Sequence, residues 1–511
     1  MFAYNYKRRR SDMVEVGRAR IGGENPIVIQ SMTNTSTLDS VGSAAQAKMI
    51  ADAGGELVRL TTQGVKEASN LVAIREEMKR IGCEVPISAD VHFNPNAAYK
   101  AAETADKVRI NPGNFVDAAR TFRKLEFTDE EYAGEIDRIR QSFLPFLDLC
   151  RQHHTAVRLG VNHGSLSDRI MSRYGDTPAG MVESVMEYLR IAREVDFRNI
   201  VISIKASNTV VMVETVRLLV AEMDREGMHF PLHLGVTEAG DAEDGRIKSA
   251  VGIGALLHEG IGDTIRVSLS EPPENEVPVA IELRDYVCRR AEAPQVEMPS
   301  RVLPGASRDY ADKSLPLREF SIVDARMLGA LAAEIDRYVA DGGKNPVLMK
   351  IAYDCDDLDR LRIRAGADFG ALLLSGYGEE IRVEDPHFDR ETLDRLASDI
   401  MQAARRRFYK TEFISCPGCG RTLFDLQSTL QDVKRAVSSL GISGLKIGVM
   451  GCIVNGPGEM ADADYGYVGA GPGRVSIYRN KELVIKNIPT AEALPALLDL
   501  IRTERGANPA D

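Results

Sequence analysis

Short apolar runs alternate with longer amphipathic stretches between about residue 26 and residue 273. The apolar runs have the length and composition of buried strands, and the stretches between them repeat their apolar positions with helical spacing. We predict eight strands, at 27–34, 57–63, 87–93, 107–114, 156–165, 200–207, 232–240 and 264–273. The clearest helical stretches are 43–53, 66–81, 177–195 and 210–226. This alternation is typical of an α/β fold with a parallel sheet.

The number of these units favours a closed (β/α)8 TIM barrel. Eight units in about 250 residues are the usual content of such a barrel, and closure buries strands that are apolar on both faces. A doubly wound open sheet is the alternative. We predict a barrel domain over residues 1–275, an inserted α/β middle domain over 276–403 and a small α/β domain over 404–511. Proline-bearing stretches at 271–276 and 291–308 are typical of linkers, and the middle block carries no motif with an evident chemistry.

The last hundred residues or so have the pattern of a small α/β unit. The predicted elements are a helix at 424–440, strands at 445–452, 466–468, 474–479 and 482–488, and a closing helix at 490–505. Three cysteines lie in this part: Cys416 and Cys419 in a C-x-x-C spacing, and Cys452 after the apolar run 445–450. A C-x-x-C turn brings two sulfurs close enough to share one metal or cluster.

The fourth ligand of this site decides what it holds. No cysteine follows Cys452, and the last histidine of the chain is His387. A zinc site with four Cys or His ligands therefore cannot be built from this segment alone. Glu459, after the glycine-bearing turn 455–458, is the nearest oxygen ligand. Three thiolates with one exchangeable position suit a [4Fe-4S] cluster that can bind substrate, and zinc or ordinary buried thiols are the alternatives.

Charged and polar residues recur near the C-terminal ends of the predicted barrel strands, where TIM barrels carry their chemistry. The five cations are Arg59, Arg109, Arg158, Lys205 and Arg266. The other candidates at this level are Asp90, His92, Asn111, Asn162, Glu238 and Ser268. Unpaired buried cations cost several kcal/mol, and two acids do not neutralise five bases. The pattern predicts a phosphate or diphosphate ligand, although each arginine taken singly is equally well explained by a structural ion pair.

Composition and charge narrow the classes of function. The chain has 511 residues, 44% apolar and 27% charged, and a formal net charge of −11. This acidic balance argues against a nucleic-acid partner or an anionic membrane. The seven cysteines are scattered, no export signal begins the chain, and no run of eighteen apolar residues occurs. We therefore expect a cytoplasmic protein without a membrane span.

Several stretches together resemble the family of 4-hydroxy-3-methylbut-2-enyl diphosphate synthase, of the methylerythritol phosphate route to isoprenoids. They are 30–35, 89–93, 108–114, 158–162, 237–240, 260–269 and both cysteine motifs. The resemblance implies a TIM barrel followed by a small α/β [4Fe-4S] domain of the nitrite and sulfite reductase type. The middle block resembles a shortened form of the insert found in the longer, plant-like members.

The resemblance also implies a reaction and a set of residue roles. The reaction is the two-electron reductive ring opening and dehydroxylation of 2-C-methyl-D-erythritol 2,4-cyclodiphosphate to (E)-4-hydroxy-3-methylbut-2-enyl diphosphate. The cluster ligands would be Cys416, Cys419, Cys452 and Glu459. The substrate-binding residues would be Arg59, Arg109, Asn111, Arg158, Asn162, Lys205, Arg266 and Ser268. Glu238, Asp90 and His92 would be the catalytic acid/base and hydroxyl-orienting groups, with Glu238 delivering the proton.

No dinucleotide fingerprint follows a predicted strand, so a ferredoxin or flavodoxin is the expected electron donor. Residues 405–407, three successive arginines, are a candidate basic landing patch for it. A homodimer is compatible with the sequence. Two other functions are compatible with the sequence. One is a barrel enzyme of another class, such as a pterin-binding methyltransferase whose cluster only relays electrons. The other is a non-catalytic, zinc-stabilised binding module.

Overall fold

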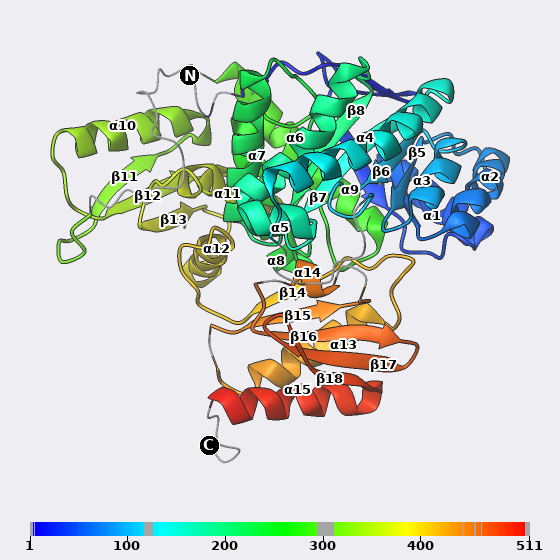
Figure 1. The fold of residues 1–511 in the computed structure, drawn as a ribbon. Coiled ribbons are helices and arrows are strands. Elements are labelled where there is room, and N and C mark those ends of the chain that lie inside the picture. Colours follow the sequence, from blue (N-terminus) through cyan, green and yellow to red (C-terminus); the bar gives the residue numbers. More distant parts are fainter. Residues whose placement is uncertain are drawn as a thin grey trace.

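The computed structural model describes residues 4, 6–116, 126–293, 311–442, 444–453, 456–460 and 462–505. Three units follow one another along the chain: a barrel, a middle α/β unit beside it, and a C-terminal α/β unit at one end of the barrel (Figure 1). Nearly all of the predicted linker at 291–308 lies outside the described residues. No described helix combines the length and the apolar character that a membrane crossing needs.

The first unit is a closed barrel of eight parallel strands. They are β3 (Val28–Met32), β4 (Leu57–Thr62), β5 (Ile87–Val91), β6 (Lys107–Ile110), β7 (Ala156–Asn162), β8 (Ile200–Lys205), β9 (His233–Leu234) and β10 (Thr264–Ile265). Their order is β8-β7-β6-β5-β4-β3-β10-β9. A parallel bridge between Ile202 in β8 and Leu232, just before β9, joins the two ends of the sheet. The predicted TIM barrel is confirmed, and the open-sheet alternative is wrong.

Helices cover the outside of the barrel. They are α1 (Ser40–Asp52), α2 (Val65–Arg80), α3 (Pro95–Ala102), α4 (Asp129–Gln152), α5 (Asp168–Tyr174), α6 (Pro178–Glu194), α7 (Thr209–Arg225), α8 (Ala242–His258) and α9 (Glu276–Cys288). Many begin at a side chain that accepts from the free N–H groups of the first turn, such as Asn94 before α3 and Thr128 before α4. α9 begins one residue beyond the predicted boundary at 275 and packs against β3 and α8.

A short hairpin closes the bottom of the barrel. Its strands are β1 (Val14–Val16) and β2 (Ala19–Ile21), paired antiparallel. Val14, Val16 and Ile21 form one buried cluster with residues at the starts of four barrel strands: Val28, Leu57, Ala156 and Val201. Strands of three residues are too short for periodicity to reveal, so the sequence pattern did not predict this plug.

The middle unit is a three-stranded parallel sheet with helices. The strands are β11 (Arg318–Ile322), β12 (Val347–Ala352) and β13 (Glu380–Glu384), in that order, and the helices are α10 (Leu328–Ala340), α11 (Leu358–Leu373) and α12 (Arg390–Ala403). Short 3₁₀ helices occupy Pro273–Asn275, Arg289–Glu292 and Ala325–Met327.

The middle unit is held to the barrel by close packing of α11 on α8. A Cβ on Gly370 would lie only 2.7 Å from the Val251 Cα, and one on Gly254 would lie 2.6 Å from the Ala367 Cβ. Beside these glycines the buried Asp368 carboxylate pairs with Arg290 at 3.0 Å, and the His258 Nε2 lies 3.1 Å from it. Glycine and a satisfied buried carboxylate therefore set the distance and register between the two units.

The C-terminal unit has its own core and a five-stranded sheet. The strand order is β14 (Glu412–Ser415), β15 (Lys446–Met450), β16 (Tyr465–Gly471), β17 (Arg474–Arg479) and β18 (Glu482–Pro489), the first three parallel and the rest antiparallel. The helices are α13 (Leu426–Ser438), the four-residue α14 (Gly456–Glu459) and α15 (Thr490–Arg505). The sequence pattern missed β14, whose four residues lead directly into Cys416.

The packing of α11 on α8 predicts the effect of a small substitution. Gly370→Ala should lower the melting temperature although alanine is the better helix former, because overpacking against the Val251 backbone costs about 1 to 3 kcal/mol. Gly134→Ala is the matched control: Gly134 is exposed in α4, and a Cβ there would meet nothing within 4 Å. This variant should be up to about 1 kcal/mol more stable. Equal melting temperatures of the two variants in a calorimetric scan would contradict close helix contact at Gly370.

Candidate active site at the barrel mouth

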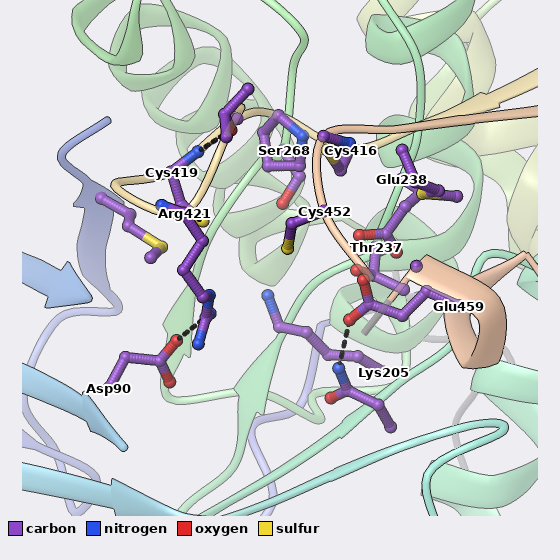
Figure 2. A pocket seen from close by; sticks show the side chains of 18 of the residues that line it. Asp90, Lys205, Thr237, Glu238, Ser268, Cys416, Cys419, Arg421, Cys452 and Glu459 are labelled. Atoms are coloured by element: carbon purple, nitrogen blue, oxygen red, sulfur yellow. Dashed lines mark hydrogen bonds and ion pairs between the residues drawn. The ribbon is translucent and has the colours of Figure 1, made fainter. Parts of the chain in front are cut away.

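A cavity lies where the C-terminal unit covers the mouth of the barrel (Figure 2). The barrel side of the wall comes from residues inside its strands, such as Arg59 and Arg158, and from residues at or just beyond their C-terminal ends. These are Met32, Arg59, Asp90, His92, Arg109, Arg158, Asn162, Lys205, Thr237, Glu238, Arg266 and Ser268. The other side comes from the C-terminal unit, with Cys416–Cys419, Arg421, Thr422, Met450–Cys452, Gly456 and Glu459. Two parts of the chain that are separated by the whole middle unit therefore enclose one space.

Backbone contacts attach the C-terminal unit to the barrel. Ser415, the last residue of β14, forms a parallel bridge with Ala239. The Ser270 hydroxyl contacts the Ser415 hydroxyl at 2.8 Å and donates to the Cys416 carbonyl at 3.0 Å. These contacts fix the position of Cys416, which begins the cysteine turn.

A second contact lies beside Glu459. Gly164, at φ +75°, and Gly458 approach so closely that a Cβ on Gly164 would lie 2.2 Å from the Gly458 carbonyl oxygen. Only glycine fits this approach. Next to it, the Asn162 amide donates to the Glu459 Oε1 at 2.7 Å. The loop after β7 and the loop after β15 thus bring Glu459 into the mouth of the barrel.

The three C-terminal cysteines all line this cavity. The Gly451 N–H lies 3.3 Å from the Cys416 sulfur, and the Arg421 N–H lies 3.4 Å from the Cys419 sulfur. Backbone N–H groups directed at sulfur are favourable for thiolates and help to set the potential of iron–sulfur clusters. No three His, Cys, Asp or Glu side chains among the described residues surround a single-ion position. A four-iron cluster takes its protein ligands at different irons, and the donor set of three sulfurs and one carboxylate fits it.

Cations outnumber acids around the cavity. Its lining contains six basic side chains, Arg421 included, and three acidic ones. Arg158 is 1% exposed, with its Nε on the Ser203 hydroxyl at 2.9 Å and no partner for Nη1 among the described residues. Burial, reinforced by the surrounding guanidinium groups, lowers the pKa of Arg158 and of Lys205 well below their usual values. An anionic ligand would relieve both effects.

One carboxylate is shared among several of these cations. Asp90 lies 3.4 Å from Arg109, 3.9 Å from Arg59 and 3.7 Å from Arg421. Burial alone would raise the pKa of Asp90, but Arg59 and the other neighbouring positive charges hold it well below its usual value. Burial and Arg109 lower the pKa of His92 to about 3, so its ring is neutral and accepts from Arg109. Asp90 is therefore a fixed negative charge and His92 a neutral polar group.

Glu238 and Glu459 meet at the opposite side of the cavity. Burial first, and then the Glu459 carboxylate and a hydrogen bond to it, raise the pKa of Glu238 well above its usual value. Glu238 is 2% exposed, and its Oε2 has no hydrogen-bond partner among the described residues. Its backbone has φ +48°, a conformation that is unfavourable for residues other than glycine. A carboxyl whose protonated form is favoured by its surroundings is thus held at the cavity with one oxygen available to a ligand.

The predicted site residues come together with one exception. Asn111 does not line the cavity. Its amide donates to the Ser165 hydroxyl at 3.0 Å, and its Oδ1 accepts from Gly113 N–H at 3.0 Å, so it shapes the loop after β6. Because a side chain at a strand end can turn into the following loop as readily as into the mouth, strand position alone did not distinguish Asn111.

Two other expectations need correction. Arg266 lines the cavity but is already paired bidentately with Glu276 of α9, at 2.9 and 3.0 Å, so the count of two acids was too low. The arginines at 405–407 are also engaged: Arg405 with Glu412, Arg406 with the Gly378 carbonyl, and Arg407 with Glu380 at 2.6 Å. They do not form the free basic patch expected for an electron donor.

Among the wall residues that sequence reasoning did not single out, Met32 and Arg421 contact charged groups of the site. Met32 presents its sulfur to Arg59 at 2.8 Å and to Arg266 at 3.5 Å, a weak acceptor between two guanidinium groups. Arg421 enters the mouth from the C-terminal unit. Its position two residues after Cys419 was a signal that could have been used.

The geometry defines a class: a TIM-barrel protein whose cationic mouth is covered by a cysteine-bearing α/β domain. Family models match the chain in two places, the GcpE TIM-barrel domain over residues 11–281 and the GcpE protein C-terminal domain over residues 412–503. The chain belongs to the GcpE family.

Curated relatives match nearly the whole chain, and each is named 4-hydroxy-3-methylbut-2-en-1-yl diphosphate synthase (flavodoxin). One from Bacteroides fragilis is 49% identical over 98% of this chain and 97% of its own length. Relatives from Phocaeicola vulgatus and Akkermansia muciniphila are 48% and 40% identical, over 98% of this chain and 99% and 97% of their own lengths. The family resemblance is therefore confirmed. The alignment with the Bacteroides fragilis relative runs over 607 positions, so that relative has insertions that this chain lacks.

Solved structures match less closely. A dihydropteroate synthase from Xanthomonas albilineans is 13% identical over 56% of this chain and 100% of that chain, with a TM-score of 0.36. A similarity this low indicates nothing about the function of the chain.

The unpaired cations predict opposite effects of one substitution on stability and on binding. Lys205→Met should weaken the binding of inorganic diphosphate about tenfold or more, because a charge-assisted contact contributes about 1.5 to 3 kcal/mol. The same change removes a buried charge that other cations repel, so the melting temperature should stay level or rise. Lys48→Met, on the exposed face of α1, is the control and should alter neither. Calorimetric titration and thermal melts would show whether Lys205→Met instead lowers stability and spares binding.

Proposed function

We propose that the chain catalyses the reductive ring opening and dehydroxylation of 2-C-methyl-D-erythritol 2,4-cyclodiphosphate to (E)-4-hydroxy-3-methylbut-2-enyl diphosphate. The main observation behind this proposal is that one cavity is lined both by the cations of the barrel mouth and by the three cysteines and Glu459 of the C-terminal unit. The names of its curated relatives support it. The middle unit then serves as a scaffold that helps to hold the C-terminal unit over the mouth.

The reaction takes up two electrons and two protons, and one oxygen of the substrate leaves as water. A [4Fe-4S] cluster held by Cys416, Cys419, Cys452 and Glu459 would supply the electrons singly and a Lewis-acidic position for the substrate oxygen. Asn162, which donates to the Glu459 carboxylate in the structure, holds that side chain toward the cavity.

The cations bind and orient the diphosphate. Arg158 and Lys205, which lack an acidic partner at hydrogen-bonding distance among the described residues, gain most from an anion. Arg59, Arg109 and Ser268 contribute further donors on the same wall. When the diphosphate is held by these cations, the carbon skeleton of the substrate lies toward the cysteines. Holding the substrate in one orientation lowers the entropic cost of reaching the transition state.

Glu238 donates the proton that the departing oxygen needs. Burial and the neighbouring Glu459 carboxylate raise its pKa, which favours the protonated form, and its Oε2, without a hydrogen-bond partner among the described residues, is available to meet a substrate oxygen. Asp90 stays ionised and, with neutral His92, holds Arg109 and orients the substrate hydroxyl. The barrel and the C-terminal unit together exclude water from this space.

The electrons come from a small protein donor. The relatives' name gives flavodoxin, and we assign a flavodoxin or a ferredoxin to this chain. We place the enzyme in the cytoplasm and assign it no nucleic-acid or membrane partner. The proposed activity needs no second subunit, because one chain supplies every ligand and cation named above; a homodimer is compatible with it.

Anaerobic purification and turnover test the proposal. Protein reconstituted with iron and sulfide should be brown, should bleach in air, and should convert the cyclic diphosphate to the linear diphosphate with reduced flavodoxin. A colourless protein with one equivalent of zinc and no turnover would favour the binding-module alternative instead.

Glu459→Ala tests the fourth ligand. Because the three cysteines remain, the cluster should persist with an altered electron paramagnetic resonance spectrum, while turnover falls about 100-fold or more. Cys452→Ser is the comparison and should lose most of the iron. Unchanged spectra and full turnover in Glu459→Ala would remove Glu459 from the ligand set.

Glu238→Gln tests the proton donor. The amide keeps the shape of the side chain but has no acidic proton, so kcat should fall about 10² to 10⁴-fold. The affinity for inorganic diphosphate should change little, because the cationic wall is intact. A variant with normal kcat and weakened diphosphate binding would make Glu238 a binding residue instead.

A further inference from the structure

Arg421 is the one cation that the C-terminal unit contributes to the described cavity lining. It lies in the turn between β14 and α13, two residues after Cys419. Its side chain points away from its own domain and down into the barrel mouth, as Figure 2 shows. Arg421 thus connects the C-terminal unit to the barrel, two parts of the chain that meet only in the folded protein.

Arg421 contacts a charged group of each domain. On the barrel side its Nη2 lies 3.7 Å from the Asp90 Oδ2, longer than a hydrogen bond. On its own side its backbone N–H lies 3.4 Å from the Cys419 sulfur. The guanidinium is charged, because an arginine side chain is not deprotonated in a protein at ordinary pH.

The position is unfavourable for a merely structural arginine. Arg421 is 8% exposed, and Asp90 is already shared with Arg59 and Arg109. A third guanidinium on one carboxylate gains little from it, and burying that charge costs several kcal/mol unless other negative groups are present. The cysteine sulfurs and a bound anion would be such groups.

We infer that Arg421 is a positioning residue that joins the cysteine-bearing turn to the anion site. It holds that turn against Asp90, adds a positive charge to the diphosphate pocket from above, and keeps this charge beside the sulfurs of Cys419 and Cys452. This inference rests on the proposed function for the identity of the anion and of the cluster. It gives the C-terminal unit a part in anion binding besides its cysteines.

The test compares Arg421→Gln, Arg421→Lys and the wild-type chain in two measurements that need no turnover. The first is the affinity for inorganic diphosphate. It should fall about tenfold or more in Arg421→Gln and stay within about threefold in Arg421→Lys, because lysine keeps the charge. The second is the midpoint potential of the reconstituted cluster. It should be lower in Arg421→Gln, since a nearby positive charge favours the added electron, and should be largely restored in Arg421→Lys.

Arg435→Gln is the matched control, because it removes the same charge from the same domain at an exposed position in α13. It should leave both measurements unchanged within about twofold. Wild-type affinity and potential in Arg421→Gln would overturn the inference. So would failure of both Arg421 variants to fold, because the side chain would then be structural. Absence of turnover in the wild-type chain would count against the proposed function alone, since the diphosphate titration does not depend on it.

Discussion

Buried positive charge without enough carboxylates is the constraint on which this structure depends. Six cationic side chains line a space with three acids, and one of those acids, Glu238, has a pKa raised well above its usual value. Such an arrangement is costly for a folded protein unless a ligand repays it. Burial of apolar side chains in the closed barrel offsets this destabilisation. The parallel strands and the hairpin below them form a large apolar core next to the charged mouth. Stability is supplied by the barrel wall and chemistry is confined to its mouth.

The position of the C-terminal unit follows from small residues and from shared polar contacts. Gly164 and Gly458 lie on two loops that approach so closely that a Cβ on Gly164 would clash with the Gly458 carbonyl. Beside them, the Asn162 amide donates to the Glu459 carboxylate. The bridge from Ala239 to Ser415 extends the contact along a strand, just before the first cysteine. The middle unit is held to the barrel, in turn, through α11 and the buried Asp368. The result is one cavity built from two domains, with the three cysteines on one side and five of the six cations on the other.

The prediction from sequence succeeded where the chemistry is local. The start of each barrel strand was predicted to within one residue because each begins a continuous apolar run, but the C-terminal ends were placed too late, most of all for β9 and β10. The cations near the strand ends were found because βα loops always leave the same edge of a barrel. It failed where partners come from distant segments. Glu276 neutralises Arg266, Asn111 turns into its own loop, and the arginines at 405–407 pair with Glu412, Glu380 and a backbone carbonyl. Short strands such as β1, β2 and β14 leave too few residues for a period to be read.

The sequence by itself determined the fold class, the three units and the chemical inventory: three cysteines without a fourth, and an excess of basic residues at strand ends. These properties depend on residue type and spacing along one segment, so they are present before the chain folds. Only the tertiary structure decided which charges are paired, which carboxyl keeps its proton, and that Arg421 shares a cavity with Asp90. Pairing and protonation depend on burial and on distances between segments hundreds of residues apart, and the chain acquires these only when the barrel closes and the last domain docks on it.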